Sequence, residues 1–235
     1  MSSSRPLTGT APPPESPRTP GRRIRGLDAE QRRQQRRQQL LDAALELIAA
    51  NGYSNTSIEQ ICQAAYVGTK GFYEIFDSKE ACYVDLLRRI AETSGTTMVE
   101  AMRTAPSDEH LATPILVATF AHSLVDDSRV AVVTFGEASG VSRAIEVQRR
   151  ANRRWAAQLV ESIWSQYDES AGARRTQPSR PTNRHRMAIG AVGGMFDLIA
   201  DWLLDANPTD DADIQRLIDD LTAFFQIVRA GLDAL

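Results

Sequence analysis

Apolar residues recur three and four positions apart through most of the chain, a spacing that predicts helices. The first helix is expected to begin near Asp28, and its apolar face comprises Leu40, Leu41, Ala44, Leu47 and Ile48. Asn51-Gly52 should end it as a helix C-cap. Later helical segments are expected near residues 107–127, 129–138, 141–169, 181–205 and 210–233. Because no segment alternates apolar and polar residues as a half-buried strand does, the predicted fold class is all-α.

Two short helices, separated by a tight break at residues 65–67, are predicted between Ser57 and Phe76. Ser57 with Gln60, or Thr56 with Glu59, can form a capping box at the start of the first. The second helix, from about residue 68 to residue 76, should anchor itself inward through Val67, Phe72 and Phe76. It should turn Thr69, Lys70 and Tyr73 outward, where these side chains can reach a phosphate or a base edge. This arrangement is a helix-turn-helix, a motif that reads DNA.

The charge distribution points the same way. The chain of 235 residues has a formal net charge of only -3. Residues 1–37 hold nine arginines and three acids, a balance of +6, so the remainder carries -9. Residues 1–21 hold six of the eleven prolines, a composition typical of a disordered arm. The following GRRIRG segment either lies in a minor groove or is simply solvated.

The sequence offers little support for a metal centre, a disulfide framework or a membrane anchor. Its two cysteines, Cys62 and Cys82, form no CxxC or Cys/His cluster and are expected to be buried thiols in a reducing compartment. The first twenty residues do not resemble a signal peptide, and the apolar run 114–125 is too short to span a bilayer. We therefore expect a cytoplasmic protein with no membrane association, no metal and no cofactor.

Residues 40–87 closely resemble the DNA-binding domain of TetR-type (tetracycline-repressor family) transcriptional regulators. The positions that match the family pattern are Gly52, Tyr53, Ser57, Ile61, Ala65, Val67, Phe72, Tyr73, Phe76, Ser78, Lys79 and Glu80. Two positions depart from it: Tyr66 stands where the family has Gly in the turn, and Gly68 stands where Ser or Thr caps the recognition helix. Gly68 supplies no side-chain acceptor, so the recognition helix is expected to begin more loosely or to point differently than in the family pattern.

The resemblance implies three regions: a basic arm over residues 1–26, a DNA-binding domain over 27–90 and an effector-binding and dimerisation domain over 91–235. It also implies an all-helical homodimer that binds an inverted-repeat operator in double-stranded DNA and responds to a small hydrophobic effector. Lys70 and Thr69 should approach bases, and Tyr73 and Lys79 should hold phosphates. The candidate DNA-binding residues are Arg36, Ser57, Tyr66, Gly68, Thr69, Lys70, Tyr73 and Lys79.

The last two helices are candidates for the dimer interface. Gly190, Gly193 and Gly194 lie inside a helix, where each glycine costs about 1 kcal/mol relative to alanine and therefore needs a tertiary reason. The final helix carries an apolar seam spaced four and three residues apart, as in helix bundles. The alternative is an ordinary core within one chain. The candidate interface residues are Gly190, Gly194, Phe196, Trp202, Leu221, Phe225 and Val228.

An effector cavity is expected among the aromatic and methionine residues of the middle helices, although each of these is also an ordinary core residue. The candidates are Met98, Met102, Phe120, His122, Phe135, Trp155 and Trp164, with Glu137 as a further polar group. For His122 a satisfied core histidine is the preferred interpretation. The cluster Arg143, Arg149, Arg150, Arg153 and Arg154 either contacts an acidic ligand or, as we prefer, forms a solvated helix face above a buried side with Trp155.

Three functions follow in order of support: a ligand-responsive repressor, an architectural DNA binder and an enzyme. The acidic body argues against an architectural protein, which would bind DNA without discriminating between sequences. No nucleophile elbow, phosphate-binding loop or dinucleotide fingerprint is present in the sequence, so no enzymatic activity is expected.

Overall fold

The structure is a computed structural model of one chain, and it describes residues 28–136, 142–170 and 181–233. These ranges contain nine helices and no strands, which confirms the all-α class. The helices are α1 (Ala29–Asn51), α2 (Ile58–Ala64), α3 (Thr69–Tyr73), α4 (Lys79–Thr104), α5 (Glu109–Val125), α6 (Ser128–Phe135), α7 (Arg143–Ser170), α8 (Pro181–Asp205) and α9 (Asp211–Asp233). The predicted arm over residues 1–26 lies outside the described residues.

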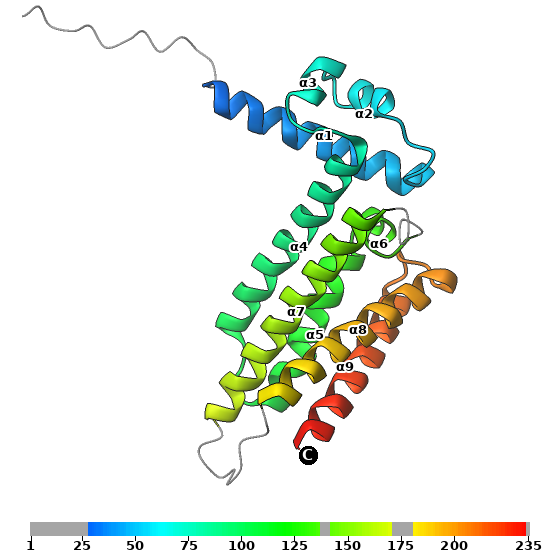
Figure 1. Cartoon of the computed structure of the whole chain (residues 1–235). Helices are drawn as coiled ribbons and strands as arrows, with labels where there is room; N and C mark the ends of the chain where they lie inside the picture. The colour runs from blue at the N-terminus through cyan, green and yellow to red at the C-terminus, as the bar shows by residue number, and fades with distance from the viewer. Residues whose placement is uncertain (1–27, 137–141, 171–180, 234–235) are drawn as a thin grey trace, which may run out of the picture.

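Figure 1 shows a head made of α1, α2 and α3 at one end of α4, and a body in which α4 is joined by α5 to α9. The 26 residues of α4 run without a break from the head into the body. The predicted division after residue 90 therefore falls inside a continuous helix. Any change in the tilt of α4 moves the head relative to the body.

Local sequence signals explain where the helices of the head begin and end. Asp28 and Gln31 form a capping box at the start of α1, and Gly52 closes that helix with a φ of 80°, a conformation that suits glycine. Ser57 and Gln60 form a second capping box at α2, and Ser78 caps α4. The predicted helix starts are thus confirmed by hydrogen bonds of the expected kind.

The head is attached to the body by buried contacts and by ion pairs. Leu40, Leu41 and Ala44 of α1 are fully buried against α4 and α6. Arg37 pairs with Asp85 at 2.7 Å, and Arg89 pairs with Asp42 at 2.6 Å. Together these contacts hold α1 across the first turns of α4.

The body is a helical bundle in which α8 and α9 lie together on the side away from α4 (Figure 1). α7 packs on α4 and α8, and α5 packs on α4 and α9. At the end far from the head, Arg229 of α9 pairs with Glu109 of α5 at 2.6 Å and with Asp168 of α7 at 2.5 Å. Arg184 of α8 also pairs with Asp168. One charged cluster therefore links four helices.

α8 differs from the other helices of the described residues. Its segment Arg184–Asp205 is apolar and long enough to cross a membrane by length and composition alone, yet only 28% of the apolar window is buried within the chain. A helix with this property needs a second apolar surface to cover it, and that surface need not be a lipid.

Candidate DNA-binding and effector sites

The helix-turn-helix is built around a turn in the left-handed region. Tyr66 has a φ of 54°, a region that non-glycine residues seldom adopt. The turn is held by backbone bonds from Val67 N to Cys62 O at 3.0 Å and from Ala65 N to Ile61 O at 2.9 Å. The Tyr66 side chain is 96% exposed. The position that departs from the family pattern therefore presents a whole aromatic ring to the outside.

The recognition helix α3 is short, and buried aromatic residues fix its orientation. Phe72 is fully buried and packs against Phe76 with ring centroids 5.6 Å apart. Gly68 begins α3 without a side-chain cap, as expected. Thr69, Lys70 and Tyr73 are exposed. With Phe72 inward, these three side chains share the outer surface with Tyr66.

Arg36 connects α1 to the end of the recognition helix. Its guanidinium lies 3.0 Å from the carboxylate of Glu74, directly after α3. The side chain also passes Gly71, where an added Cβ would lie 3.6 Å from Arg36 Nη1. Arg36 therefore positions α3 in the free protein, and a role at a phosphate stays a prediction.

Lys79 is held by backbone oxygens. Its ammonium donates to the carbonyl oxygens of Tyr53 at 2.8 Å and of Thr56 at 2.7 Å, and it lies 4.4 Å from the centroid of the Tyr53 ring. Partial burial lowers the pKa of this amine. An ammonium has three N–H donors, so one remains beyond the two carbonyl bonds. Lys79 fixes the loop before α2, and the predicted phosphate contact would use the remaining donor.

Two adjoining cavities lie inside the body. Both open to the outside, and the empty space in them, including solvent at their open mouths, is about 580 and 620 Å³. The residues that line both are Ser94, Phe120, Trp155 and Ala156. Trp155 can lie against α4 because Gly95 has no side chain: an added Cβ there would be 2.3 Å from the tryptophan ring.

Three of the predicted effector residues, Met98, Phe120 and Trp155, line these cavities. Met102 and Phe135 pack nearby without lining them. Trp164 is fully buried in the core beside Phe225. Glu137 lies outside the described residues.

The prediction of a core histidine at position 122 is wrong. The His122 side chain is 48% exposed and bonds to Asp126 at 2.7 Å, one turn along α5. It lines neither cavity. Its apolar neighbours in the sequence suggested burial, but its place on the helix turns it outward.

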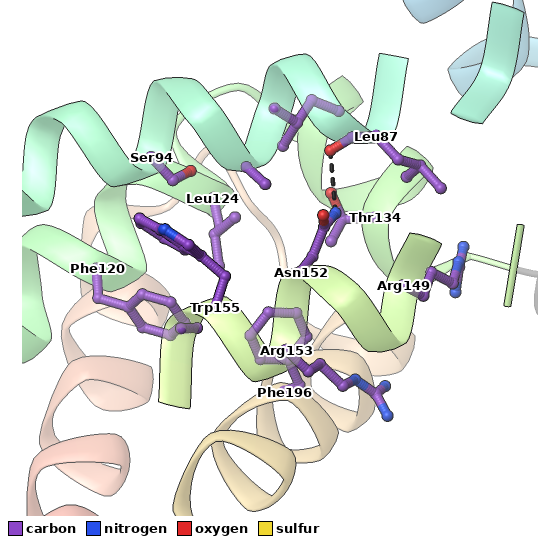
Figure 2. A pocket seen from close by; sticks show the side chains of 13 residues that line it. Leu87, Ser94, Phe120, Leu124, Thr134, Arg149, Asn152, Arg153, Trp155 and Phe196 are labelled. Atoms are coloured by element: carbon purple, nitrogen blue, oxygen red, sulfur yellow. Dashed lines mark hydrogen bonds between the residues drawn. The ribbon is translucent and has the colours of Figure 1, made fainter. Parts of the chain in front are cut away.

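Figure 2 shows a polar end of the first cavity that the sequence did not reveal. Thr134 of α6 and Arg149, Asn152 and Arg153 of α7 gather there, while Phe120 and Trp155 lie toward the other end. The preferred interpretation of the α7 arginines as a solvated face holds for Arg150 and Arg153, which are exposed, and fails for Arg149, which is half-buried; Arg149 and Arg153 both line the first cavity. The missed signal is their spacing of four residues, which puts both on one side of α7.

The predicted dimer-interface residues divide between the interior and the surface. Leu221 is fully buried and Phe225 is 6% exposed, so both belong to the core of one chain. Phe196 also points inward, with ring centroids 6.0 Å from Phe120 and 5.3 Å from Phe135. These three assignments are corrected: the apolar seam of α9 packs inside the chain. Trp202 and Val228 are half-buried.

The glycines of α8 divide in the same way. A Cβ on Gly194 would lie 2.4 Å from the Phe224 ring, so this glycine serves the contact between α8 and α9 within the chain. A Cβ on Gly190 or Gly193 would meet nothing within 4 Å. The exposed large apolar residues of the same two helices are Ile189, Leu198 and Leu204 of α8 and Ile227 of α9.

Known proteins resemble the head more closely than the body. The family model of the bacterial regulatory proteins of the tetR family matches residues 40–86. The chain is 33% identical over 103 residues to the HTH-type transcriptional regulator TcmR of Streptomyces glaucescens. The aligned region covers 44% of this chain and 41% of that protein. The chain thus spans about two-fifths of the length of this curated relative.

Solved structures share the fold along most of the chain. The transcriptional regulator FadR from Bacillus subtilis, in complex with stearoyl-CoA, is similar with a TM-score of 0.63 and 18% identity, over 81% of this chain and 96% of that one. A TetR-family regulator from Syntrophomonas wolfei gives a TM-score of 0.65 and 18% identity, over 85% and 97%. Residues 40–86 thus match the tetR family of bacterial regulatory proteins, and most of the chain shares its fold with these solved regulators.

Proposed function

We propose that this transcriptional regulator is a homodimeric repressor that binds an inverted-repeat operator and leaves it when a small molecule enters the body. The observation that carries the proposal is the outer surface of the helix-turn-helix. Tyr66, Thr69, Lys70 and Tyr73 are exposed together there, on a short helix that a buried Phe72 fixes in place.

The exposed groups match what a DNA groove requires. Lys70 and Thr69 lie in the first turn of α3, and the N-terminal residues of a recognition helix are those that contact base edges. The rings of Tyr66 and Tyr73 lie beside them, where their hydroxyls can donate to phosphate oxygens. Among the described residues of α3, no acid competes with DNA for Lys70.

The exposed apolar side chains of α8 and α9 support a dimer. Ile189, Leu204 and Ile227 are 40%, 78% and 71% exposed, and Gly190 and Gly193 have no steric reason within the chain to be glycine. A second copy packed two-fold on this surface would cover the apolar residues and use the glycines for close helix approach. Such a dimer would carry two heads to two half-sites of one operator.

A line of contacts supports communication between the cavity and the head. Arg149 of the cavity lies 3.5 Å from the hydroxyl of Tyr83 and 3.3 Å from the carbonyl oxygen of Val133. The Tyr83 hydroxyl donates to the same carbonyl at 2.8 Å, and its ring packs on Tyr53, 5.0 Å between centroids. A ligand that moves Arg149 would thereby disturb the first turns of α4, where the head is attached.

The proposal is tested by selecting genomic fragments with the purified protein. We expect enrichment of a short inverted repeat and bound complexes with two protomers on each site. Lys70→Ala should lower affinity for that repeat by about 1–3 kcal/mol, whereas Arg103→Ala, on the far part of α4, should leave it unchanged. Fragments retained without any common sequence would refute a sequence-specific regulator.

A further inference from the structure

We infer that the effector is an anionic amphiphile: its apolar part lies along Phe120 and Trp155, and its carboxylate or other oxyanion binds Arg149 and Arg153. This inference rests on the proposed function, because it names the chemical class of the molecule that the body would sense. It depends on the two ends of the joined cavities, which differ in chemistry.

The polar end has buried groups with unused hydrogen-bonding capacity. Arg149 Nε and the hydroxyl of Thr134 are both buried and have no hydrogen-bond partner among the described residues. The bonds that Arg149 does make, at 3.3 and 3.5 Å, are long. An unpaired buried donor is unfavourable by about 1–3 kcal/mol, so a ligand with acceptor oxygens would remove a penalty already present in the free protein.

Asn152, in contrast, already makes two hydrogen bonds that hold its side chain in place. Its amide donates to the Leu87 carbonyl at 3.1 Å, and its oxygen accepts from Gln148 at 2.8 Å. Figure 2 shows the first of these bonds between α7 and α4. The side chains left for a ligand at this end are therefore Thr134, Arg149 and Arg153.

The charge at this end favours an anion. Among the described residues, no aspartate or glutamate lines either cavity. The nearest acid on the same helix, Glu146, bonds to Arg150 at 2.6 Å, and that bond lowers the pKa of Glu146. Arg153 lies over the Phe196 ring, 5.5 Å from its centroid. Two cations at a partly enclosed site with no acid in its wall attract a negative group.

The other end favours a hydrocarbon. The second cavity is lined by side chains that are almost all apolar, including Met98, Leu116, Val117, Ile163 and Val192. Because both cavities share Phe120 and Trp155, one extended molecule can occupy both. A shift of the Trp155 ring, which lines both cavities, would merge them into one, so the ligand should be longer than either cavity alone.

Three ligands with the same ten-carbon chain test the inference: decanoate, decanol and decyltrimethylammonium. Each is titrated into the full-length protein by calorimetry. We expect decanoate to bind at least about tenfold more tightly than decanol, as a charge-assisted hydrogen bond allows, and the cationic ligand to bind most weakly. Arg153→Gln should abolish the preference for decanoate, and Arg149→Gln should do the same.

Matched controls come from the same helix. Arg150→Gln and Arg154→Gln remove the same charge from exposed positions and should keep the preference. Arg153 makes no hydrogen bond to another element in the described chain, so Arg153→Gln separates ligand binding from loss of folding, which melting curves also monitor.

Equal binding of decanoate and decanol, no binding of decanoate, or a preference that survives both Arg149→Gln and Arg153→Gln would each overturn the inference. None of these results would contradict the proposed function as a sequence-specific DNA-binding regulator. Failure of the proposed function would show instead as an absence of an enriched sequence in the fragment selection.

Discussion

Two neighbouring glycines of α8 make the dimer proposal testable with single methyl groups. A Cβ on Gly194 would lie 2.4 Å from the Phe224 ring, while a Cβ on Gly193 would meet nothing within 4 Å of its own chain. Alanine at these adjacent positions should therefore have opposite effects on the folding of one protomer. Its effect on association should depend on whether a second copy covers Gly193.

The magnitudes follow from helix propensity and packing. Replacing an interior helical glycine by alanine contributes about 1 kcal/mol, so Gly193→Ala should stabilise the separated protomer by about that amount. If a partner helix lies on the same face, overpacking is unfavourable by roughly 1–3 kcal/mol at each site, and the two-fold axis doubles it. The dimer Kd should then rise at least about thirtyfold. Gly194→Ala should instead destabilise the protomer by roughly 1–3 kcal/mol.

Sedimentation equilibrium measures the dimer Kd, and urea unfolding at a concentration below that Kd measures the protomer alone. The expected pattern is a more stable, poorly associating Gly193→Ala variant and a less stable Gly194→Ala variant. A Gly193→Ala protein that dimerises as tightly as the wild type would refute the placement of this face in the interface.

Three further substitutions test the head and the far end of the body. Tyr66→Asn should relieve strain in the left-handed backbone at residue 66, which favours Asn over Tyr. The variant should therefore be more stable by about 0.5–1 kcal/mol in thermal unfolding and yet bind the operator more weakly. A lower stability of the variant would contradict this reasoning. Lys79→Met removes two bonds to backbone oxygens and should reduce stability by about 2 kcal/mol. It should also lower affinity for operator and random DNA alike in a salt titration, and unchanged affinity would make Lys79 purely structural. Arg229→Met should destabilise the body by about 3–5 kcal/mol when urea unfolding is followed at neutral pH. Burial raises the pKa of Asp168, but its bonds to Arg229 and Arg184 prevail and lower it, so this stability is present above the unfolded pKa of about 3.9 and is lost as pH falls through the lower folded value. As pH falls below the unfolded pKa, the variant should lose less stability than the wild type, because without Arg229 the pKa of Asp168 is lowered less; identical pH profiles would exclude Asp168 from the cluster's contribution.

The head was predictable because its signals are local. The capping box at Ser57 and the serine cap at Ser78 involve residues three positions apart, and the anchors Phe72 and Phe76 follow from the helical period. What the sequence did not show is the position of Lys79. Its bonds to the oxygens of Tyr53 and Thr56 join segments 26 and 23 residues apart, and no periodic pattern encodes such a contact.

The body was less predictable because apolar spacing does not say which chain covers a residue. The seam of α9 with Leu221 and Phe225 fits a dimer and a single-chain core equally well, and the packing of α5 and α7 decides for the core. At α7 the opposite error occurred, because charged residues were predicted to lie in solvent. Arginines are exposed so often that Arg149 was assigned to solvent, although it is half-buried and lines the first cavity beside the exposed Arg153.

Arg149, which lines the first cavity, also contacts Tyr83 in the first turns of α4, where the head is attached to the body. Arg149 shares the Val133 carbonyl with the Tyr83 hydroxyl, and Tyr83 is buried in the first turns of α4 directly against Tyr53. An anion at Arg149 would compete with these two neutral oxygens, and a charged acceptor is favoured over a neutral one. α6, which carries Val133, would then lose its hydrogen bond to α7 and keep the one to Tyr83 of α4. Because α6 also packs on α1, binding of the ligand's charge at Arg149 would, under the proposed mechanism, also loosen the support of the DNA-binding head.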